Sequence, residues 1–288
     1  MQNLAAPIRS ERRSEKSPKG DAVDIEDKVR DHYSGDDLEG RILDALTGAG
    51  IDLETLRPEQ LAGLDQLHAG FAPATDHVLD LLHLAADTPL IDVGSGIGGC
   101  SRRAAGRGCV VTGVDLSADF VEVARSLTRR VGLMDRVTFE NASATDLPHP
   151  DGSFARAMLV HAGMNIPDKA RVFAEVRRVL RRDGLFALYE QMRIGDGELT
   201  FPMPWAEDES SSFVERRGRY AELLSDADFV VEHDEDRTAA VAALGPPAPG
   251  ALTPAVLMGP RFEESIGNNI SASASGTLAA VVMVARAV

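Results

Sequence analysis

The stretch LIDVGSGIGG, residues 90–99, decides the fold. It opens on a short apolar run typical of a buried strand, and glycines follow at Gly94, Gly96 and Gly99. Glycine at this spacing lets the chain turn sharply from a strand into a helix, and it lets backbone amides approach a ligand closely. The stretch therefore predicts a strand, a glycine loop and a helix that together bind a nucleotide.

Short apolar runs alternate with amphipathic segments on the carboxyl side of this loop. Alternation at this spacing predicts a parallel, doubly wound α/β sheet. We expect strands at 90–94, 110–115, 137–141, 155–161 and 185–191, and helices at about 97–107, 119–132, 167–184 and 215–225. The helix over 167–184 is expected to start at a cap on Asp168, to include Leu180 on its apolar face and to end at Gly184.

The last two apolar runs break the alternation. FVVEHDED (229–236) and TLAAVVMVARA (277–287) are separated by a proline-rich, partly helical stretch that offers no regular crossover helix. Strands joined in this way predict an antiparallel pair at the edge of the sheet.

The domain organisation follows from the composition along the chain. Residues 1–27 are polar and locally basic, which predicts a disordered tail. Residues 28–87 carry helical spacings around 38–46, 58–68 and 73–85, and we expect a helical extension there. Residues 88–288 then form the core, with substrate-side insertions at about 195–214 and 238–276.

Charge and hydropathy exclude several classes of partner. The 288 residues hold 30 Lys and Arg against 45 Asp and Glu, a formal charge of −15, which opposes binding to nucleic acid. The sequence contains no apolar run long enough to span a bilayer and no signal-peptide core, so we expect a soluble, cytoplasmic protein without a membrane partner. Cys100 and Cys109 are expected to be buried, reduced thiols.

Two acidic residues bear on which nucleotide is bound. Asp92 lies two residues before Gly94, where the carboxylate would repel the pyrophosphate of NAD at close range. A ligand that carries cationic groups and no phosphate suits this position, and S-adenosylmethionine is such a ligand. Asp115 ends the second strand, where it can accept hydrogen bonds from both ribose hydroxyls of either cofactor or cap the following helix.

The motifs together resemble those of class I S-adenosylmethionine-dependent methyltransferases. The resemblance is carried by the glycine loop, VTGVDLS (111–117), ATDLPHPDGSF (144–154) and NIPDKARVFAEVRRVLRRDGLFALYE (165–190). It extends to DQLHAG (65–70), FPMPWA (201–206) and LMGP (257–260), and it is strongest to the small-molecule branch of sarcosine/dimethylglycine-type and natural-product methyltransferases.

The resemblance implies a Rossmann-like sheet of seven strands with the last strand antiparallel, covered by the helical extension as a lid. It also implies a cofactor site. Gly94, Ser95 and Gly96 would wrap the methionine part, Asp115 and Leu116 would hold ribose and adenine, Ser143 and Ala144 would face adenine, and Gln66, His68 and Tyr33 would come from the lid. The sequence departs from the family at Ser143 and Ala155, where relatives usually carry acids.

Two histidines are candidates for catalysis. Methyl transfer is an in-line displacement, so a base is needed only if the acceptor must lose a proton. His161 follows the fourth strand and could act as that base, bind the cofactor or fill the pocket floor. His68 is the second candidate, with a stronger claim to shaping the cofactor pocket. Asn165 could orient the acceptor or cap the following helix.

The residues expected at the acceptor mouth are apolar. Met164, Met192, Trp205 and Met258 favour a bulky apolar acceptor, such as a secondary metabolite methylated on O, C or N. An amino-acid N-methyltransferase is the second interpretation, with Arg193 as the carboxylate clamp. A repurposed fold that binds S-adenosylmethionine and catalyses a non-methylating cyclisation is the third. We expect S-adenosyl-L-homocysteine as product, no metal, a small-molecule partner, and an oligomeric state left open.

Overall fold

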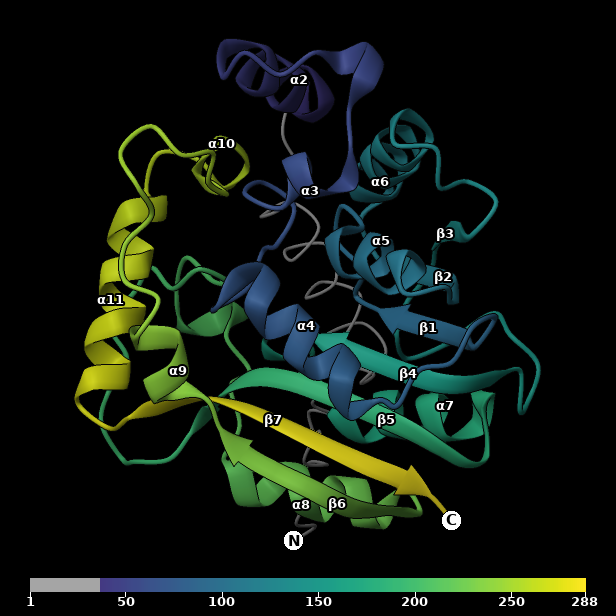
Figure 1. The fold of residues 1–288 in the computed structure, drawn as a ribbon. Coiled ribbons are helices and arrows are strands. Elements are labelled where there is room, and N and C mark those ends of the chain that lie inside the picture. The colour runs from purple at the N-terminus through teal and green to yellow at the C-terminus, as the bar shows by residue number, and fades with distance from the viewer. Residues whose placement is uncertain (1–36) are drawn as a thin grey trace, which may run out of the picture.

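The computed structural model describes residues 37–288 as a twisted seven-stranded sheet with helices on both faces (Figure 1). The strand order is β3-β2-β1-β4-β5-β7-β6. The strands are β1 (Pro89–Val93), β2 (Val110–Asp115), β3 (Val137–Asn141), β4 (Phe154–Val160), β5 (Leu180–Arg193), β6 (Phe229–Asp236) and β7 (Leu278–Ala287).

Strands β1 to β5 pair in parallel, and β7 runs antiparallel to both of its neighbours, β5 and β6. The predicted fold class is therefore confirmed, as is the antiparallel pair of β6 and β7 at the sheet edge. The carboxyl ends of the parallel strands lie together at one end of the sheet, where doubly wound folds bind their ligands.

The sheet has an apolar core on each face because side chains alternate along its strands. Along β7, Ala279, Val281 and Met283 join one core, whereas Ala280 and Val282 join the other. Strands covered on both faces read as continuous apolar runs, which explains the composition of 278–287.

Two groups of helices, each consecutive in sequence, cover the two faces of the sheet. α4 (Phe71–Leu81), α5 (Gly99–Gly106) and α6 (Ala118–Arg130) pack on one face. α7 (Lys169–Val179) and α8 (Arg217–Asp226) pack on the other. The remaining helical elements are α2 (Leu38–Gly48), η1 (Leu53–Thr55), α3 (Pro58–Leu61), η2 (Gly163–Asn165), η3 (Glu209–Ser211), α9 (Thr238–Ala242), α10 (Ala255–Met258) and α11 (Phe262–Ala274).

Helix α2 lies at the top of the molecule in Figure 1, above α3 and the strands. Its apolar residues, including Ile42 and Leu46, pack against Phe120 and Leu127 of α6 and against Leu257 of α10. The segment before β1 is helical as predicted in α2 and α4. The helix expected over 58–68 is shorter, because only Pro58–Leu61 is helical and the chain then turns towards the sheet.

The helix expected over 167–184 ends early. Asp168 caps α7 as predicted, accepting a hydrogen bond from the amide of Arg171 at 2.9 Å. The prediction that the helix continues to Gly184 is wrong, because Leu180 is already extended, with ψ at 141°, and pairs with Phe154. Leu180 is buried against the sheet, so its apolar character fitted a helix face and a strand equally well.

Two further expectations concern the chain as a whole. Cys100 and Cys109 are both buried, free thiols, as predicted. Within residues 37–288, no helix combines the length and the apolar character that crossing a membrane requires.

Candidate active site

A cavity of about 1010 Å³ opens at the carboxyl ends of β1, β2 and β4. Gly94, Asp115 and His161, which follow these three strands, all line it. The segment that precedes α4 closes one side of the cavity, and the stretch that contains α9 to α11 closes another. The parallel topology therefore brings together residues from many parts of the chain, as expected for this end of a doubly wound sheet.

The glycine loop needs its glycines. Gly94 has φ at 73° and Gly96 has φ at 53°, which are left-handed values that side-chain-bearing residues rarely adopt. A Cβ on Gly94 would come within 2.3 Å of the Cβ of Ala162. The amides of Gly94 and Ser95 both donate to the carbonyl of Val114, so the loop is fixed to β2.

Asp115 lies where a ribose-binding acid is expected. Its carboxylate accepts hydrogen bonds from the amide of Gly96 at 2.7 Å and from the amide of Ser117 at 2.9 Å. Burial raises the pKa of Asp115, although these backbone hydrogen bonds act in the opposite direction. Ser117, rather than Asp115, caps α6 through its hydroxyl, so the carboxylate is oriented towards the cavity wall and not used as a cap.

Asp92 is 1% exposed and lines the same cavity. Its carboxylate accepts a hydrogen bond of 2.6 Å from the hydroxyl of Ser101. Burial raises the pKa of Asp92 to about 7, the hydrogen bond from Ser101 opposes that rise, and the nearby carboxylate of Asp115 adds to it. A cationic ligand group at this point would offset the cost of burying the charge.

Several other predicted cofactor residues also line the cavity. They are Ser95, Leu116, Ser143 and Ala144. The hydroxyl of Ser143 lies 2.8 Å from that of Thr145, within a turn that follows β3. Tyr33 lies outside the described residues.

His161 lines the cavity in a strained conformation, with φ at 52°. Its Nε2 atom is buried and has no hydrogen-bond partner within residues 37–288. Its ring lies 5.0 Å from that of Tyr189 and 5.8 Å from that of His68. Burial and the neighbouring His68 lower the pKa of His161 well below its ordinary value, so the ring is neutral at pH 7.

His68 also lines the cavity, but both of its ring nitrogens have protein partners. Nδ1 lies 3.1 Å from the carbonyl of Ala69, and Nε2 lies 2.9 Å from the hydroxyl of Thr75. Burial lowers the pKa of His68 to about 4. A ring held in this way is suited to shaping the pocket and is poorly suited to removing a proton.

Gln66 is turned away from the cavity, contrary to its predicted contact with cofactor. Its side-chain oxygen accepts a hydrogen bond from Thr75 at 2.5 Å, and its side-chain nitrogen donates to Asp65 at 2.8 Å. The chain turns between residues 65 and 68, so Gln66 points into the protein whereas His68 points into the cavity. Gln66 thus helps to hold His68 on the side that faces away from the cavity.

A buried ion pair beneath the glycine loop was not predicted from the sequence. Arg102 of α5 donates to the carboxylate of Asp65 at 2.9 Å and to the carbonyl of Ile97 at 2.7 Å. The two side chains are 1% and 3% exposed. This pair fixes the segment before α4 to the glycine loop and α5. Neither residue belongs to a local sequence pattern that indicates its burial or its partner.

Glu190 is a further buried residue that was not predicted from the sequence. It is fully buried on β5, and its Oε1 atom accepts hydrogen bonds from the amides of Ala162 and Gly163 at 3.1 and 3.0 Å. Burial raises the pKa of Glu190 to about 7. These bonds hold the loop that carries His161 into the cavity.

The predicted acceptor residues divide into two groups. Met164, Asn165, Trp205 and Met258 line the cavity. Asn165 donates from its side chain to the carbonyl of Trp205 at 2.6 Å, which joins η2 to the 201–206 segment. It does not cap α7, because Asp168 does.

Met192 is the exception, and its predicted place at the acceptor mouth is wrong. It is fully buried among Phe173, Phe186 and Tyr220 on the α7–α8 face of the sheet. Because strand residues alternate, its neighbour Gln191 points into the cavity instead, with a side-chain oxygen that has no hydrogen-bond partner in the described part of the chain.

Comparison with known proteins gives this arrangement a context. Residues 91–188 match the family described as a methyltransferase domain. Methyltransferase GfsG of Streptomyces halstedii is 32% identical over 167 residues, which cover 52% of this chain and 60% of that protein. The 27-O-demethylrifamycin SV methyltransferase of Amycolatopsis mediterranei is 36% identical over 154 residues, which cover 49% of this chain and 56% of that protein. The chain thus spans less than two thirds of the length of these relatives.

The solved structures extend the likeness over the whole fold. A geranyl diphosphate C-methyltransferase from Streptomyces coelicolor A3(2), in complex with Mg²⁺, geranyl-S-thiolodiphosphate and S-adenosyl-L-homocysteine, superposes with a TM-score of 0.65. It is 18% identical, and the superposition covers 94% of this chain and 99% of that chain. Together with the family match, these findings confirm the resemblance to class I S-adenosylmethionine-dependent methyltransferases.

Proposed function

We propose that this chain, whose residues 91–188 match a methyltransferase domain, transfers a methyl group from S-adenosylmethionine to a bulky apolar small molecule. One observation carries the proposal: a single cavity joins the glycine loop and the neighbouring acids Asp92 and Asp115 to an apolar wall built from the segments after β4, β5 and β6. Such a cavity allows a cofactor and an acceptor to be held side by side, away from water.

The acids support S-adenosylmethionine over a dinucleotide. Asp92 is buried near the end of β1 with Ser101 as its hydrogen-bond donor, and a phosphate there would disfavour the ionised carboxylate further. A cationic cofactor would instead lower the electrostatic cost of Asp92. The amides of Gly96 and Ser117 use only some of the lone pairs of the Asp115 carboxylate. The others could accept hydrogen bonds from the ribose hydroxyls.

The acceptor side of the cavity is apolar. Its wall includes Ile166, Pro204, Trp205, Val241, Leu244, Met258, Phe262, Ile266 and Ile270. A wall of this kind binds an acceptor through burial of apolar surface, and a few polar groups such as Gln191 would set its orientation.

The amino-acid N-methyltransferase interpretation lacks the arginine that it needs. Arg193 donates to the carbonyl of Gly197 and does not line the cavity. Arg171 does line it, but its guanidinium donates to the carbonyl of Thr145 at 2.9 Å and lies 3.4 Å from Glu175. No arginine of the described residues is thus positioned to clamp a free carboxylate inside the cavity.

The reaction would need little from the protein beyond alignment. S-adenosylmethionine supplies the methyl group, whose bond to sulfur breaks as the bond to the acceptor forms, and the sulfur keeps the electron pair. The residues of the cavity hold the acceptor in line and exclude water. Neutral His161, with Nε2 unpartnered, could accept the acceptor's proton.

Mass spectrometry tests the proposal. The purified chain is incubated with S-adenosylmethionine and a library of apolar metabolites, and we expect a product heavier by one methylene together with S-adenosylhomocysteine. Asp115→Ala should weaken cofactor binding by about 1–3 kcal/mol, the range for a hydrogen bond to a charged group, and reduce both signals. Transformation of an acceptor without S-adenosylhomocysteine would contradict methyl transfer and favour the cyclisation interpretation.

A further inference from the structure

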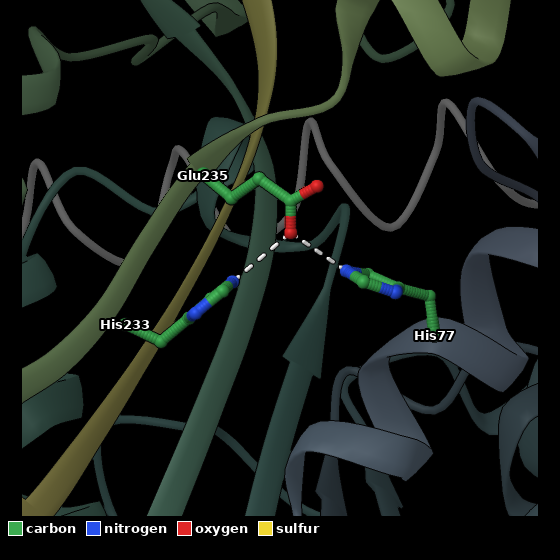
Figure 2. A group of neighbouring side chains, drawn as sticks. All are labelled: His77, His233 and Glu235. Carbon is green, nitrogen blue, oxygen red and sulfur yellow. Dashed lines mark hydrogen bonds and ion pairs between the residues drawn. The ribbon is translucent and has the colours of Figure 1, made fainter.

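A cluster of three side chains lies apart from the cavity, between α4 and β6. His77 of α4 and His233 and Glu235 of β6 point towards one another, as Figure 2 shows. Nε2 of His77 lies 2.8 Å from Oε2 of Glu235, and Nε2 of His233 lies 3.0 Å from the same oxygen. Their three ligand atoms all lie within 4.8 Å of one another.

From this convergence we propose that His77, His233 and Glu235 bind a divalent transition-metal ion, with Zn²⁺ as the ion that the ligand set suits best. Two imidazoles and one carboxylate form a ligand set that zinc sites use, and a water completes the tetrahedron. Each neutral ring would offer its Nε2 lone pair, and its proton would move to Nδ1.

The distances are compatible with this ion. Ligand atoms about 2.1 Å from a tetrahedral zinc lie about 3.4 Å apart, so the observed separations need only small side-chain rotations. The side chains of His77, His233 and Glu235 are 28%, 36% and 31% exposed, which allows water to reach the fourth position.

The neighbours of Glu235 leave one of its two carboxylate oxygens available to bind the ion. Arg237 donates to Oε1 at 2.7 Å, which orients the carboxylate and leaves Oε2 for the histidines. Strand alternation places His233 and Glu235 on one side of β6, so the acids of the opposite face do not enter the cluster, and Arg237 follows directly after the strand. A partner that orients a ligand in this way is a usual feature of metal sites.

The ion would join two walls of the cavity. His77 lies on α4, which begins at the cavity-lining Phe71, and β6 leads into α9, whose Thr238 and Val241 line the cavity as well. A Cβ built on Gly70 would come within 3.2 Å of Val241, so these two parts of the wall lie close together. The ion would therefore hold together segments that are 158 positions apart in sequence.

Titration calorimetry of the tag-free, metal-depleted chain with ZnCl₂ tests the proposal. We expect one ion per chain and, at a hundredfold excess over Kd, a rise in Tm of roughly 5 °C or more. Co²⁺ should give the visible absorption of a tetrahedral complex. His77→Gln and His233→Gln can still hydrogen-bond to Glu235, so they should fold, yet each should weaken binding on the order of 100-fold.

His83→Ala serves as the matched control, because His83 is exposed just beyond α4 and lies outside the cluster. It should bind Zn²⁺ as the parent chain does. The proposal is overturned if the parent chain shows no saturable binding, which would leave the cluster as an ion pair only. Binding of unchanged affinity in the double His77→Gln/His233→Gln variant would also overturn it, because the ion would then lie elsewhere.

Discussion

Single residues with little exposure set the chemistry at the cavity. Asp92 is buried and His161 is half-buried, and desolvation moves their pKa values in opposite directions, upwards for the carboxyl and downwards for the imidazole. Both shifts favour the neutral form. A cationic ligand would therefore favour the ionised form of Asp92. The neutral ring of His161 has one nitrogen without a proton.

Cofactor affinity should depend on pH through Asp92. Its pKa of about 7 means that acid protonates the carboxyl and removes its attraction for a cationic ligand. We expect the Kd for S-adenosylmethionine, measured by calorimetry, to rise as pH falls below 7, by up to about tenfold per pH unit. Asp92→Asn should bind weakly with little pH dependence over the same range. An equally steep profile in that variant would assign the effect to another group.

His161 should affect turnover more than binding. If its unpartnered Nε2 removes a proton, His161→Ala lowers kcat on the order of 100-fold or more and leaves cofactor affinity unchanged. Single-turnover kinetics with the identified acceptor, together with calorimetry, separate the two quantities. Reduced affinity with unchanged turnover would make His161 a binding residue, and no effect on either would make it part of the pocket floor.

At the scale of helices and strands, buried polar contacts between neighbouring elements form joints that hold these residues in place. The segment before α4 is fixed to α5 by the pair of Asp65 and Arg102, and the loop after β4 is fixed to β5 by Glu190. Both joints are polar and buried. Removing one partner from such a joint leaves the other desolvated and unpaired, which is more costly than never having buried either.

Loss of the buried pair should therefore destabilise the fold. Arg102→Met should lower the free energy of unfolding by about 3–5 kcal/mol, read from urea denaturation, because Asp65 is left without its cation. Arg103→Ala is the neighbouring control, since its ion pair with Asp76 is partly exposed and worth at most about 1 kcal/mol. Equal effects from the two substitutions would show that burial of the pair is not decisive.

Elements were predicted well where one local pattern determined them. The glycine loop and β1, β2 and β3 have sequence patterns that only one secondary structure satisfies. The end of α7 was predicted badly, because Leu180 suits a helix face and a covered strand alike. The prediction for Met192 was wrong for a related reason. Its strand was predicted, but both faces of the sheet are covered, and the sequence does not say which face leads to the cavity.

At the scale of the whole molecule, contacts between distant segments escaped prediction. Asp65 and Arg102 are 37 positions apart, and His77 and Glu235 are 158 apart. Neither pair leaves a spacing pattern, because the fold and not the local chain brings the partners together. The part of the cavity lined by the glycine loop was predictable, because that strand, loop and helix follow one another in the sequence. The apolar part of its wall is assembled from separate insertions, and its shape was not predictable.

The place of β7 in the sheet has a consequence for biosynthesis. Strand β6 pairs with β7 alone, and β5 pairs with β7 on the side away from β4. Until residues 278–287 have left the ribosome, β6 has no neighbour in the sheet and one side of β5 stays open to unintended pairing. The sheet can therefore be completed only after β7 has been synthesised, and a chaperone that shields β5 during that interval would protect it from aggregation.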